Sequence, residues 1–448
     1  MVPAMFSSTI IALATPPFPS ALALIRISGA DAFSITDQLF SKRVSDIKER
    51  TIFYGSIHDE KGEMIDLVVL LAYPGPNTVT GENVVEITCH GSPLIANQII
   101  QAYLSKGAEY ATRGEFSSRG FYNGKMDLVE AEAVNDVINA TTIESKNLAL
   151  LSLSGKTSKL VVPLKEEIAS LLALLEVGID FPEYDEEESL SNEGVVKGCT
   201  QIRERIASLI KQGEEGRFIR EGVKVAIVGE PNVGKSSILN ALLKENKAIV
   251  SDIPGTTRDV VEGTISLDGI PLFLLDTAGI HQTEDQIEQL GVERSKTSIE
   301  KADLVLFVHD ASKEESQEEA ELRSLLNGKR ILEIFNKSDK IGRLEPNKLY
   351  TSALHNDIDN LKQAIKNTLG VGEEAFKLPS LSSARELSLL RKIDQALSKA
   401  QEDASLGVTL DLLSVPLQEA YRYARELLGE EPTQDLQDEI FSRFCVGK

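Results

Sequence analysis

The chain has 448 residues, a net charge of −22 and 42% hydrophobic residues, which are values of a folded protein with about three domains. No run approaches the roughly 18 apolar residues of a membrane-spanning helix, and the N-terminus lacks the basic region of a signal peptide. The three cysteines form no metal or disulfide framework, so we expect a cytoplasmic protein without membrane contact. The acidic net charge disfavours direct nucleic-acid binding, except through a local basic patch or a basic partner.

Residues 1 to about 120 have the composition of a β-rich region. Strands are predicted at 21–27, 51–58, 67–73 and 84–89, with Pro and Gly punctuating the chain between them. From about Lys125 the pattern becomes helical. An apolar stripe at helical spacing indicates packing in a helical core, and it consists of Leu164, Ile168, Leu171, Leu172 and Leu175. Pro163 suits the first turn of that helix, and 183–188 is an acidic loop or solvated face.

Residues 229–236 read GEPNVGKS, which fits the phosphate-binding P-loop pattern G-x-x-x-x-G-K-S. A short apolar run at 223–228 predicts the preceding strand, and 238–243 begins the following helix. Backbone N–H groups of such a loop cradle phosphates, Lys235 would reach the β- and γ-phosphates, and the Ser236 hydroxyl would bind Mg²⁺. A chance glycine turn is the alternative, but three further motifs follow in order.

Asp276-Thr277-Ala278-Gly279 follows the apolar run 272–275, where an Asp can hold the Mg²⁺ shell and a Gly lets a backbone N–H approach the γ-phosphate. Asn336-Lys337-Ser338-Asp339 follows the predicted strand 331–335 and fits N-K-x-D. The Asp339 carboxylate can accept hydrogen bonds from N1–H and the 2-amino group of guanine, which adenine lacks, so the nucleotide is predicted to be GTP. Ser352-Ala353 fits the last base-contacting loop more weakly, because Leu354 stands where Lys or Arg is usual.

Residues 250–259 (VSDIPGTTRD) lie between the P-loop and Asp276, where a Thr can complete the Mg²⁺ shell when GTP is bound. We expect Thr257 to do so, with an ordinary surface loop as the alternative. The expected GTP-binding residues are Asn232, Val233, Gly234, Lys235, Ser236, Ser237, Ser251, Asp252, Ile253, Pro254, Gly255, Thr256, Thr257, Asp276, Thr277, Ala278, Gly279, Asn336, Lys337, Asp339, Ser352 and Ala353.

Helical patterning resumes after the GTPase block, where Leu390, Ile393, Leu397 and Ala400 share one face and Pro416 is expected to start or kink a later helix. The GTPase block is therefore expected to be inserted into a helical domain made of two separated segments. We place the boundaries at 1–124 for the N-terminal domain, 125–216 with 378–448 for the helical domain, and 217–377 for the GTPase domain.

With these motifs placed, the chain resembles the MnmE (TrmE) family of bacterial tRNA-modification GTPases over essentially its whole length. The most specific match is the terminal Cys445-Val446-Gly447-Lys448, similar to the family's C-[ILV]-G-K. Other matches are 24–29 (LIRISG), 74–82 (PGPNTVTGE), His90-Gly91 and 113–117 (RGEFS).

The resemblance implies an α/β plus all-α multidomain fold: an N-terminal α/β domain that dimerises and binds folate, a central helical domain, and an inserted Ras-like P-loop GTPase domain. It implies a homodimer that assembles with the FAD-dependent MnmG (GidA) into a heterotetramer. Together they would place an aminomethyl or carboxymethylaminomethyl group on the wobble uridine of certain tRNAs, with 5-formyltetrahydrofolate as the one-carbon source.

Site residues follow from the resemblance in the same way. The folate contacts would be Arg26, Glu86, Lys125 and Lys448, and Cys445 would take part in the tRNA chemistry. K⁺ would be coordinated by Asn232, Ser251, Ile253 and Thr256 and would replace the arginine finger of Ras-like proteins. Glu288 would orient the attacking water, since no Gln stands at the Ras position after Gly279.

Each of these assignments has a structural alternative. Arg26 could be a strand-edge charge, Glu86 a cross-strand partner, Lys125 a helix-start charge, Cys445 a small buried hydrophobe and Glu288 an exposed helix charge. The chain also departs from the family: PPFPSALA at 16–23 replaces a Gly-rich stretch, Ser251 stands where Thr is common, and Pro416 falls where uninterrupted helix is expected.

Of three rival functions, a membrane-transport G protein is excluded by the missing membrane spans and a ribosome-assembly GTPase is disfavoured. A ribosome-assembly GTPase of the Era or Der kind would need an RNA-binding appendage, and no G-x-x-G loop in a basic setting follows the GTPase block. A membrane-transport G protein would need membrane spans. A folate-dependent methyltransferase with a regulatory GTPase is not separated from the family function by sequence.

Overall fold

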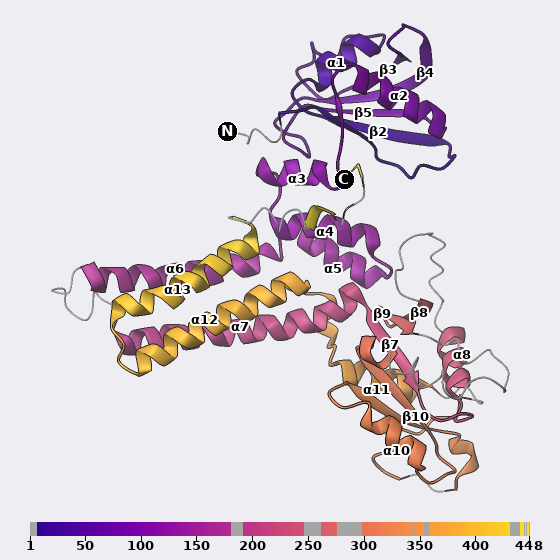
Figure 1. Ribbon diagram of the computed structural model, residues 1–448, viewed down its shortest axis with the longest axis vertical. Helices are drawn as coiled ribbons and strands as arrows, with labels where there is room; N and C mark the ends of the chain where they lie inside the picture. The colour runs from indigo at the N-terminus through magenta and orange to yellow at the C-terminus, as the bar shows by residue number, and fades with distance from the viewer. Residues whose placement is uncertain are drawn as a thin grey trace. The chain divides into compact units, whose positions relative to one another are not determined.

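The computed structural model describes residues 7–180, 191–245, 261–275, 298–342, 345–353, 358–430, 440–442, 444 and 446–447 (Figure 1). The chain forms two compact units, one made of Met1–Asn135 with Arg425–Lys448 and the other of Asp136–Ala424. The three-domain boundaries drawn from the sequence stay a prediction.

The N-terminal unit contains a six-stranded sheet of strand order β3-β4-β5-β2-β1-β6. All neighbours pair antiparallel except β1 with β6. The strands are β1 (Ile10–Leu13), β2 (Leu22–Ser28), β3 (Thr51–His58), β4 (Met64–Tyr73), β5 (Val84–His90) and β6 (Glu109–Tyr110). The four strands predicted from composition are β2 to β5, and the predicted bounds of β3 agree with the structure.

Two helices, α1 (Ala32–Leu39) and α2 (Pro93–Ser105), pack together and lie against this sheet. Alternate residues of the strands face them, because successive side chains of a strand point to opposite faces. Ile25, Leu70 and Ile87 are thereby buried with Tyr103 of α2 in one hydrophobic core. On the opposite face, Phe116 of α3 (Glu115–Tyr122) is buried with Ile10 and Ala12 of β1, whereas Ile52 and Tyr54 of β3 are exposed.

Helices α3 (Glu115–Tyr122) and α4 (Leu128–Asn139) follow the sheet in the chain, and described residues near the C-terminus pack against them. Phe441 and Phe444 are buried in one cluster with Leu128 of α4. Gly114, at the N-terminus of α3, has φ +67, and a Cβ there would lie 2.5 Å from the Phe441 carbonyl oxygen. The first and last parts of the chain therefore form one unit.

The second unit begins with helices, and two of its long helices, α7 and α12, pack against each other. The helices are α5 (Ile143–Leu153), α6 (Ser158–Asp180), α7 (Asn192–Glu221), α12 (Ala384–Ser405) and α13 (Leu410–Leu428), of which α13 ends in the first unit. Gly213 sits inside α7 because a Cβ there would lie 2.1 Å from the Leu381 carbonyl oxygen. Both predicted apolar stripes are confirmed as buried, on α6 and on α12.

The prediction for Pro163 is wrong, and Pro416 does not start a helix, while a kink at Pro416 stays a prediction. Helix α6 begins at Ser158, so Pro163 lies in its second turn rather than its first, and α13 begins at Leu410 and continues through Pro416. A proline inside a helix removes one backbone hydrogen bond. The apolar stripes of these two helices bury residues before and after each proline, including Val161 and Leu164 in α6, and Leu413 and Leu417 in α13. Burial of one continuous face outweighs the lost bond.

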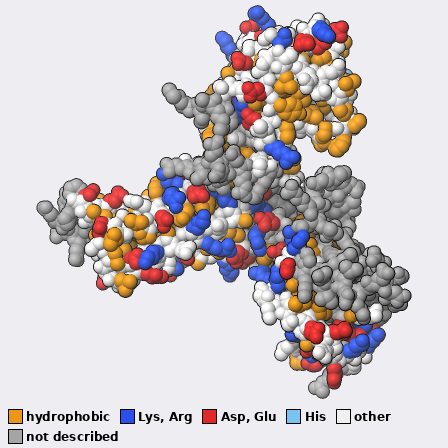
Figure 2. Space-filling model, viewed as in Figure 1, with side chains coloured by type: hydrophobic (Ala, Val, Ile, Leu, Met, Phe, Trp, Pro, Cys, Tyr) orange, Lys and Arg blue, Asp and Glu red, His pale blue; other side chains and the backbone are white. Residues whose placement is uncertain are grey.

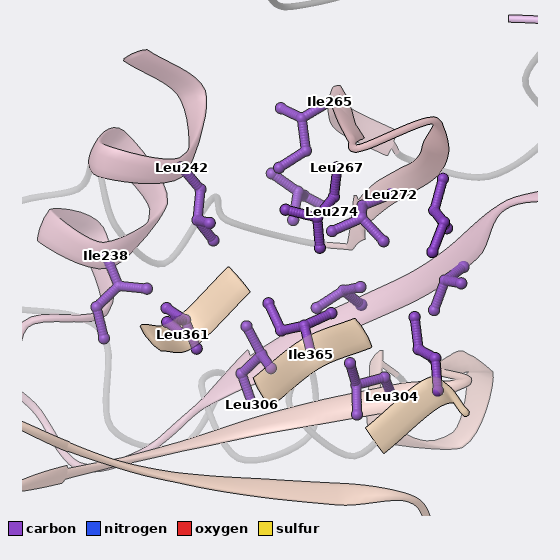
Figure 3. Close-up of a cluster of buried hydrophobic side chains, with 14 of the residues drawn as sticks. Ile238, Leu242, Ile265, Leu267, Leu272, Leu274, Leu304, Leu306, Leu361 and Ile365 are labelled. Atoms are coloured by element: carbon purple, nitrogen blue, oxygen red, sulfur yellow. The ribbon is translucent and has the colours of Figure 1, made fainter. Parts of the chain in front are cut away.

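The GTPase region folds as a five-stranded sheet of order β11-β10-β7-β9-β8, parallel except for the β8–β9 pair. The elements are β7 (Val223–Val228), α8 (Lys235–Glu245), β8 (Val261–Leu267), β9 (Ile270–Leu275), β10 (Leu304–Asp310), α10 (Gln317–Ser324), β11 (Ile331–Asn336) and α11 (Asp359–Leu369). Figure 3 shows its core, where Ile238 and Leu242 of α8, strand residues such as Leu306, and Leu361 and Ile365 of α11 point toward one another.

Candidate active site

The predicted P-loop joins β7 to α8, so the strand–loop–helix context that the motif requires is present. Lys235 is the first residue of α8 and its ammonium donates to the carbonyl oxygens of Gly229 at 2.8 Å and Glu230 at 2.6 Å. Burial lowers the pKa of Lys235, and the nearby Glu230 carboxylate partly offsets this. The ammonium is thus folded back over its own loop, at the N-terminus of a helix, where phosphate oxygens are favourable ligands.

Two glycines of the loop are required by close contacts. Gly229 has φ +154, and a Cβ there would lie 2.3 Å from the Val308 carbonyl oxygen of β10. Gly234 has φ +101, and a Cβ there would lie 2.1 Å from the Asn336 amide nitrogen. The P-loop is therefore pressed against the ends of two neighbouring strands, and the G-x-x-x-x-G spacing follows from that packing.

The N-K-x-D motif meets the P-loop through Asn336. This residue ends β11, is 3% exposed, and donates from its amide to the Val233 carbonyl oxygen at 2.9 Å. Its amide oxygen accepts from the Ala353 N–H at 3.2 Å. The Asp339 carboxylate accepts from the Ser352 hydroxyl at 2.7 Å. The structure thus brings together three sequence-predicted segments: the P-loop, Asn336 to Asp339, and Ser352-Ala353.

Lys337 makes the second bridge between the motifs. It has φ +64, and its ammonium donates to the Asn232 carbonyl oxygen at 2.6 Å and to the Asp310 carboxylate at 2.6 Å. Asn232 also has φ +64. Burial alone would raise the pKa of the Asp310 carboxyl, but the hydrogen bonds from Lys337 and Ser312 lower it to about 2.

Sequence reasoning missed Asp310. The available signal was its place at the end of the apolar run 304–308, because ligands of open α/β sheets bind beyond the carboxyl ends of parallel strands.

Part of the predicted site falls outside the described residues. This part comprises Ser251, Asp252, Ile253, Pro254, Gly255, Thr256, Thr257, Asp276, Thr277, Ala278, Gly279, Glu288, Cys445 and Lys448. Ser236 and Ser237 lie in the first turn of α8, directly after the loop.

A second cluster of predicted site residues lies in the N-terminal unit. Arg26 of β2 and Glu86 of β5 are register partners, and the guanidinium donates to the carboxylate at 2.9 Å and 2.8 Å. The Tyr73 hydroxyl donates to the other Glu86 oxygen at 3.4 Å, and burial followed by the Glu86 charge raises the pKa of Tyr73. Because β2 lies between β5 and β1, Arg26 is not an edge charge, whereas Glu86 is a cross-strand partner as well as a candidate ligand.

The end of the chain reaches the same cluster. The Gly447 carbonyl oxygen accepts from the Arg26 guanidinium at 3.2 Å, and Val446 bridges to Arg113 of the predicted RGEF motif. Gly447 has φ +93, and a Cβ there would lie 2.7 Å from the Leu13 carbonyl oxygen. Lys125 is exposed, and its Cε lies against Gly81, where a Cβ would come within 3.0 Å of it.

The described part of the chain holds buried cysteines, but no metal-binding cluster and no helix that could span a membrane. Cys89 and Cys199 are buried, and burial raises the pKa of each thiol to about 11, so both are poor nucleophiles at neutral pH. The described residues hold no group of three or more His, Cys, Asp or Glu that could bind a metal ion. None of the described helices is long and apolar enough to cross a membrane.

Comparison with known families divides the chain into two matches. The family described as "GTP-binding protein TrmE N-terminus" matches residues 9–125, and "MnmE helical domain" matches residues 128–445. The second match surrounds the GTPase motifs, as expected for a domain inserted into a helical region.

Full-length relatives give the same result. The tRNA modification GTPase MnmE of Geobacillus kaustophilus is 40% identical over 457 residues, covering 98% of this chain and 99% of the relative. Those of Bacillus subtilis and Oceanobacillus iheyensis are 38% and 37% identical, covering 98% and 99% of this chain, and 100% and 99% of those relatives. A crystal structure of Aquifex aeolicus Era bound to GDP.AlF4− is 30% identical, covering 39% of this chain and 66% of that chain, with a TM-score of 0.26.

Two family matches that together span residues 9–445, and relatives alignable from end to end, agree with the motifs assembled above. The chain therefore belongs to the MnmE family and is a tRNA-modification GTPase.

Proposed function

We propose that this chain is the K⁺-dependent, GTP-hydrolysing subunit of a complex that adds an aminomethyl or carboxymethylaminomethyl group to C5 of the wobble uridine of tRNA. The one-carbon unit would derive from 5-formyltetrahydrofolate. The observation that carries the proposal is the pair of assembled sites: a P-loop bonded to an N-K-x-D motif, and an Arg26–Glu86 pair bonded to the C-terminal tail.

At the first site, each described residue has a role suited to its position. Lys235, together with the N-terminus of α8, neutralises phosphate charge, and Ser236 supplies a hydroxyl to Mg²⁺ with Thr257 as its expected partner. Asp339 reads the guanine edge, and its bond from Ser352 fixes the carboxylate beside the base. The same proposal assigns the remaining expected GTP contacts to Asp276–Gly279 and to 251–257, outside the described residues.

Asn232 fits a monovalent cation. It is an exposed residue held in a left-handed conformation, and within the described part of the chain its side chain makes no hydrogen bond, so the amide oxygen is available. Its proposed co-ligands, Ser251, Ile253 and Thr256, would add further oxygen donors, which are the ligands that hard cations prefer. K⁺ bound there would supply the positive charge that an arginine finger supplies elsewhere. Glu288 would orient the attacking water.

At the second site, the donor set suits a folate. The Arg26 guanidinium and the exposed Lys125 ammonium can bind carboxylates of a glutamate tail, and Glu86 can accept from pterin N–H groups. The bond from Arg26 to the Gly447 carbonyl oxygen supports assigning the C-terminal motif to the same site, although Cys445 and Lys448 themselves lie outside the described residues.

A homodimer is supported by an exposed apolar patch on the β3–β4 part of the N-terminal sheet, away from β1, where Phe116 of α3 packs. Ile52 and Tyr54 of β3 are 71% and 62% exposed, and they pair in register with Leu71 and Val69 of β4. Exposed apolar rows of this kind mark interaction surfaces, and hydrophobic side chains gather on this domain in Figure 2. We propose a second copy of the chain as its partner, with the FAD-dependent MnmG completing a heterotetramer.

The test measures GTP hydrolysis at saturating nucleotide in KCl and in NaCl of equal ionic strength, beside 5-formyltetrahydrofolate binding by calorimetry. We expect a high rate in K⁺, a low rate in Na⁺, and folate binding that Arg26→Ala abolishes and Arg43→Ala leaves unchanged. Arg43 is an exposed arginine of the same unit and serves as the control. Equal rates in the two salts would mean that another group supplies the positive charge.

A further inference from the structure

Two residues at the carboxyl end of β10 contact segments of the nucleotide site. The first contact is part of the packing of the P-loop against the sheet, and the second is not. The first is the Val308 carbonyl oxygen, against which Gly229 packs. The second is Asp310, the last residue of the strand, whose side chain is 5% exposed. Asp310 lies in parallel register with Asn336 of β11, so the next residue, Lys337, begins beside it.

A buried carboxylate needs a cation or hydrogen-bond donors to compensate its lost hydration. Asp310 has both: Lys337 at 2.6 Å, and the Ser312 N–H and hydroxyl at 3.1 Å and 2.6 Å. The Ser312 bonds are local, made two residues along the same segment, and they lead to no other part of the site. The Lys337 bond is the one that leads out of the strand toward the nucleotide loops.

The same ammonium of Lys337 donates to the Asn232 carbonyl oxygen at 2.6 Å. Asn232 and Lys337 both have φ +64, a conformation that residues other than glycine adopt rarely and only when their surroundings hold it. One lysine side chain therefore links three chain segments: the end of β10, the base-reading loop and the P-loop.

We propose that Asp310 is a positioning residue that acts through Lys337 to hold Asn232 in its left-handed conformation, and so couples guanine recognition to the cation ligand of the P-loop. The proposal gives Asp310 no direct contact with nucleotide or cation. The coupling to the cation rests on the function proposed above, while the Asp310–Lys337–Asn232 connection is independent of it.

A double-mutant cycle on the full-length chain tests the connection. Affinity for fluorescent GDP is measured for Asp310→Asn, Lys337→Ala and the double variant, with Ser312→Ala as the matched control that removes the other side-chain bond to Asp310. We expect Asp310→Asn to weaken binding about tenfold, since hydrogen bonds to charged groups contribute about 1.5–3 kcal/mol. In the Lys337→Ala background the same change should alter affinity less than about twofold, and Ser312→Ala should also stay within about twofold.

Equal losses from Asp310→Asn in both backgrounds would overturn the inference alone, because Asp310 would then act independently of Lys337. No loss from Lys337→Ala would overturn the inference together with the proposed guanine site. If Asp310→Asn yields little folded protein, Asp310→Ser takes its place in the same cycle.

A second measurement tests whether the Asp310–Lys337 pair affects Asn232. The K⁺ concentration for half-maximal GTPase rate, measured at saturating GTP, should rise several-fold in Asp310→Asn and stay unchanged in Ser312→Ala. A merely structural role would lower the melting temperature and leave this K⁺ midpoint in place. An unchanged K⁺ midpoint with weakened GDP binding would show that the effect of Asp310 ends at Lys337. It would refute the coupling between guanine recognition and the cation ligand.

Discussion

Replacing Gly234 by Ala would add a methyl group between the P-loop and Asn336 of the N-K-x-D motif. In Gly234→Ala, the new Cβ would lie 2.1 Å from the Asn336 amide nitrogen, well inside van der Waals contact. Asn336 is buried and held by two hydrogen bonds, to the Val233 carbonyl oxygen and from the Ala353 N–H. Relief therefore requires that Asn336 give up these bonds or that the loop move away from β11.

The magnitude follows from three contributions. A non-glycine residue in the left-handed region costs about 1–2 kcal/mol. Loss of the two Asn336 hydrogen bonds adds about 1 kcal/mol each. The P-loop can relax around the methyl group when no nucleotide is bound, but not while it holds phosphates. The summed cost of about 3–4 kcal/mol is therefore expected in the free energy of nucleotide binding. At about 1.4 kcal/mol per tenfold, GDP affinity should fall about 10²- to 10³-fold.

The assay is a titration with fluorescent GDP, accompanied by thermal unfolding. Gly370→Ala is the matched control, because Gly370 lies in the same sheet domain with φ +71 but has nothing within 4 Å of its added Cβ. The control should lose about 1 kcal/mol of stability and keep its nucleotide affinity. Affinity of Gly234→Ala within about twofold of the wild type would refute the assignment of the Gly234–Asn336 contact as the junction of the site.

The other predictions use the same reasoning. Asp339→Asn should shift preference from GTP toward xanthosine triphosphate, and unchanged GTP affinity would contradict the base assignment. Glu288→Ala should cut turnover while nucleotide affinity stays nearly intact; affinity falling in step with rate would make Glu288 structural. Gly447→Ala should displace the tail and abolish wobble-uridine modification while K⁺-stimulated GTP hydrolysis continues, whereas Gly407→Ala, with φ +74 and open space, should do neither. Because the folded pKa of Asp310 is about 2, its stabilisation is present above pH about 4 and is lost as the pH falls through about 2, so the melting-temperature difference from Asp310→Asn should shrink from pH 5 to pH 3.

The strands and the motif positions were predictable because their signals are local. The 51–58 run matches β3 throughout, and the P-loop, its flanking strand and its helix lie where the spacing placed them. Pro163 misled for the opposite reason: where α6 begins is decided by burial against distant helices, which a local rule does not contain.

The contacts that join the sites were not predictable in the same way. Asp310 reaches Lys337 across 27 residues of chain, and Arg26 reaches Gly447 across 421. No local periodicity marks such pairs. The terminal motif identified the family, but only the fold shows that Gly447 lies on Arg26 and that Phe441 packs against Gly114 of the RGEF segment.

In the proposed function, this chain drives wobble-uridine modification through its nucleotide site and the site bonded to the C-terminal tail. The most direct measurement is mass spectrometry of the wobble nucleoside of tRNA from a deletion strain, complemented with the wild-type chain or with Lys235→Ala. We expect loss of the C5-aminomethyl or C5-carboxymethylaminomethyl uridine in the deletion, its return with the wild type, and its continued absence with Lys235→Ala. Unchanged modified uridine in the deletion strain would contradict the proposed function.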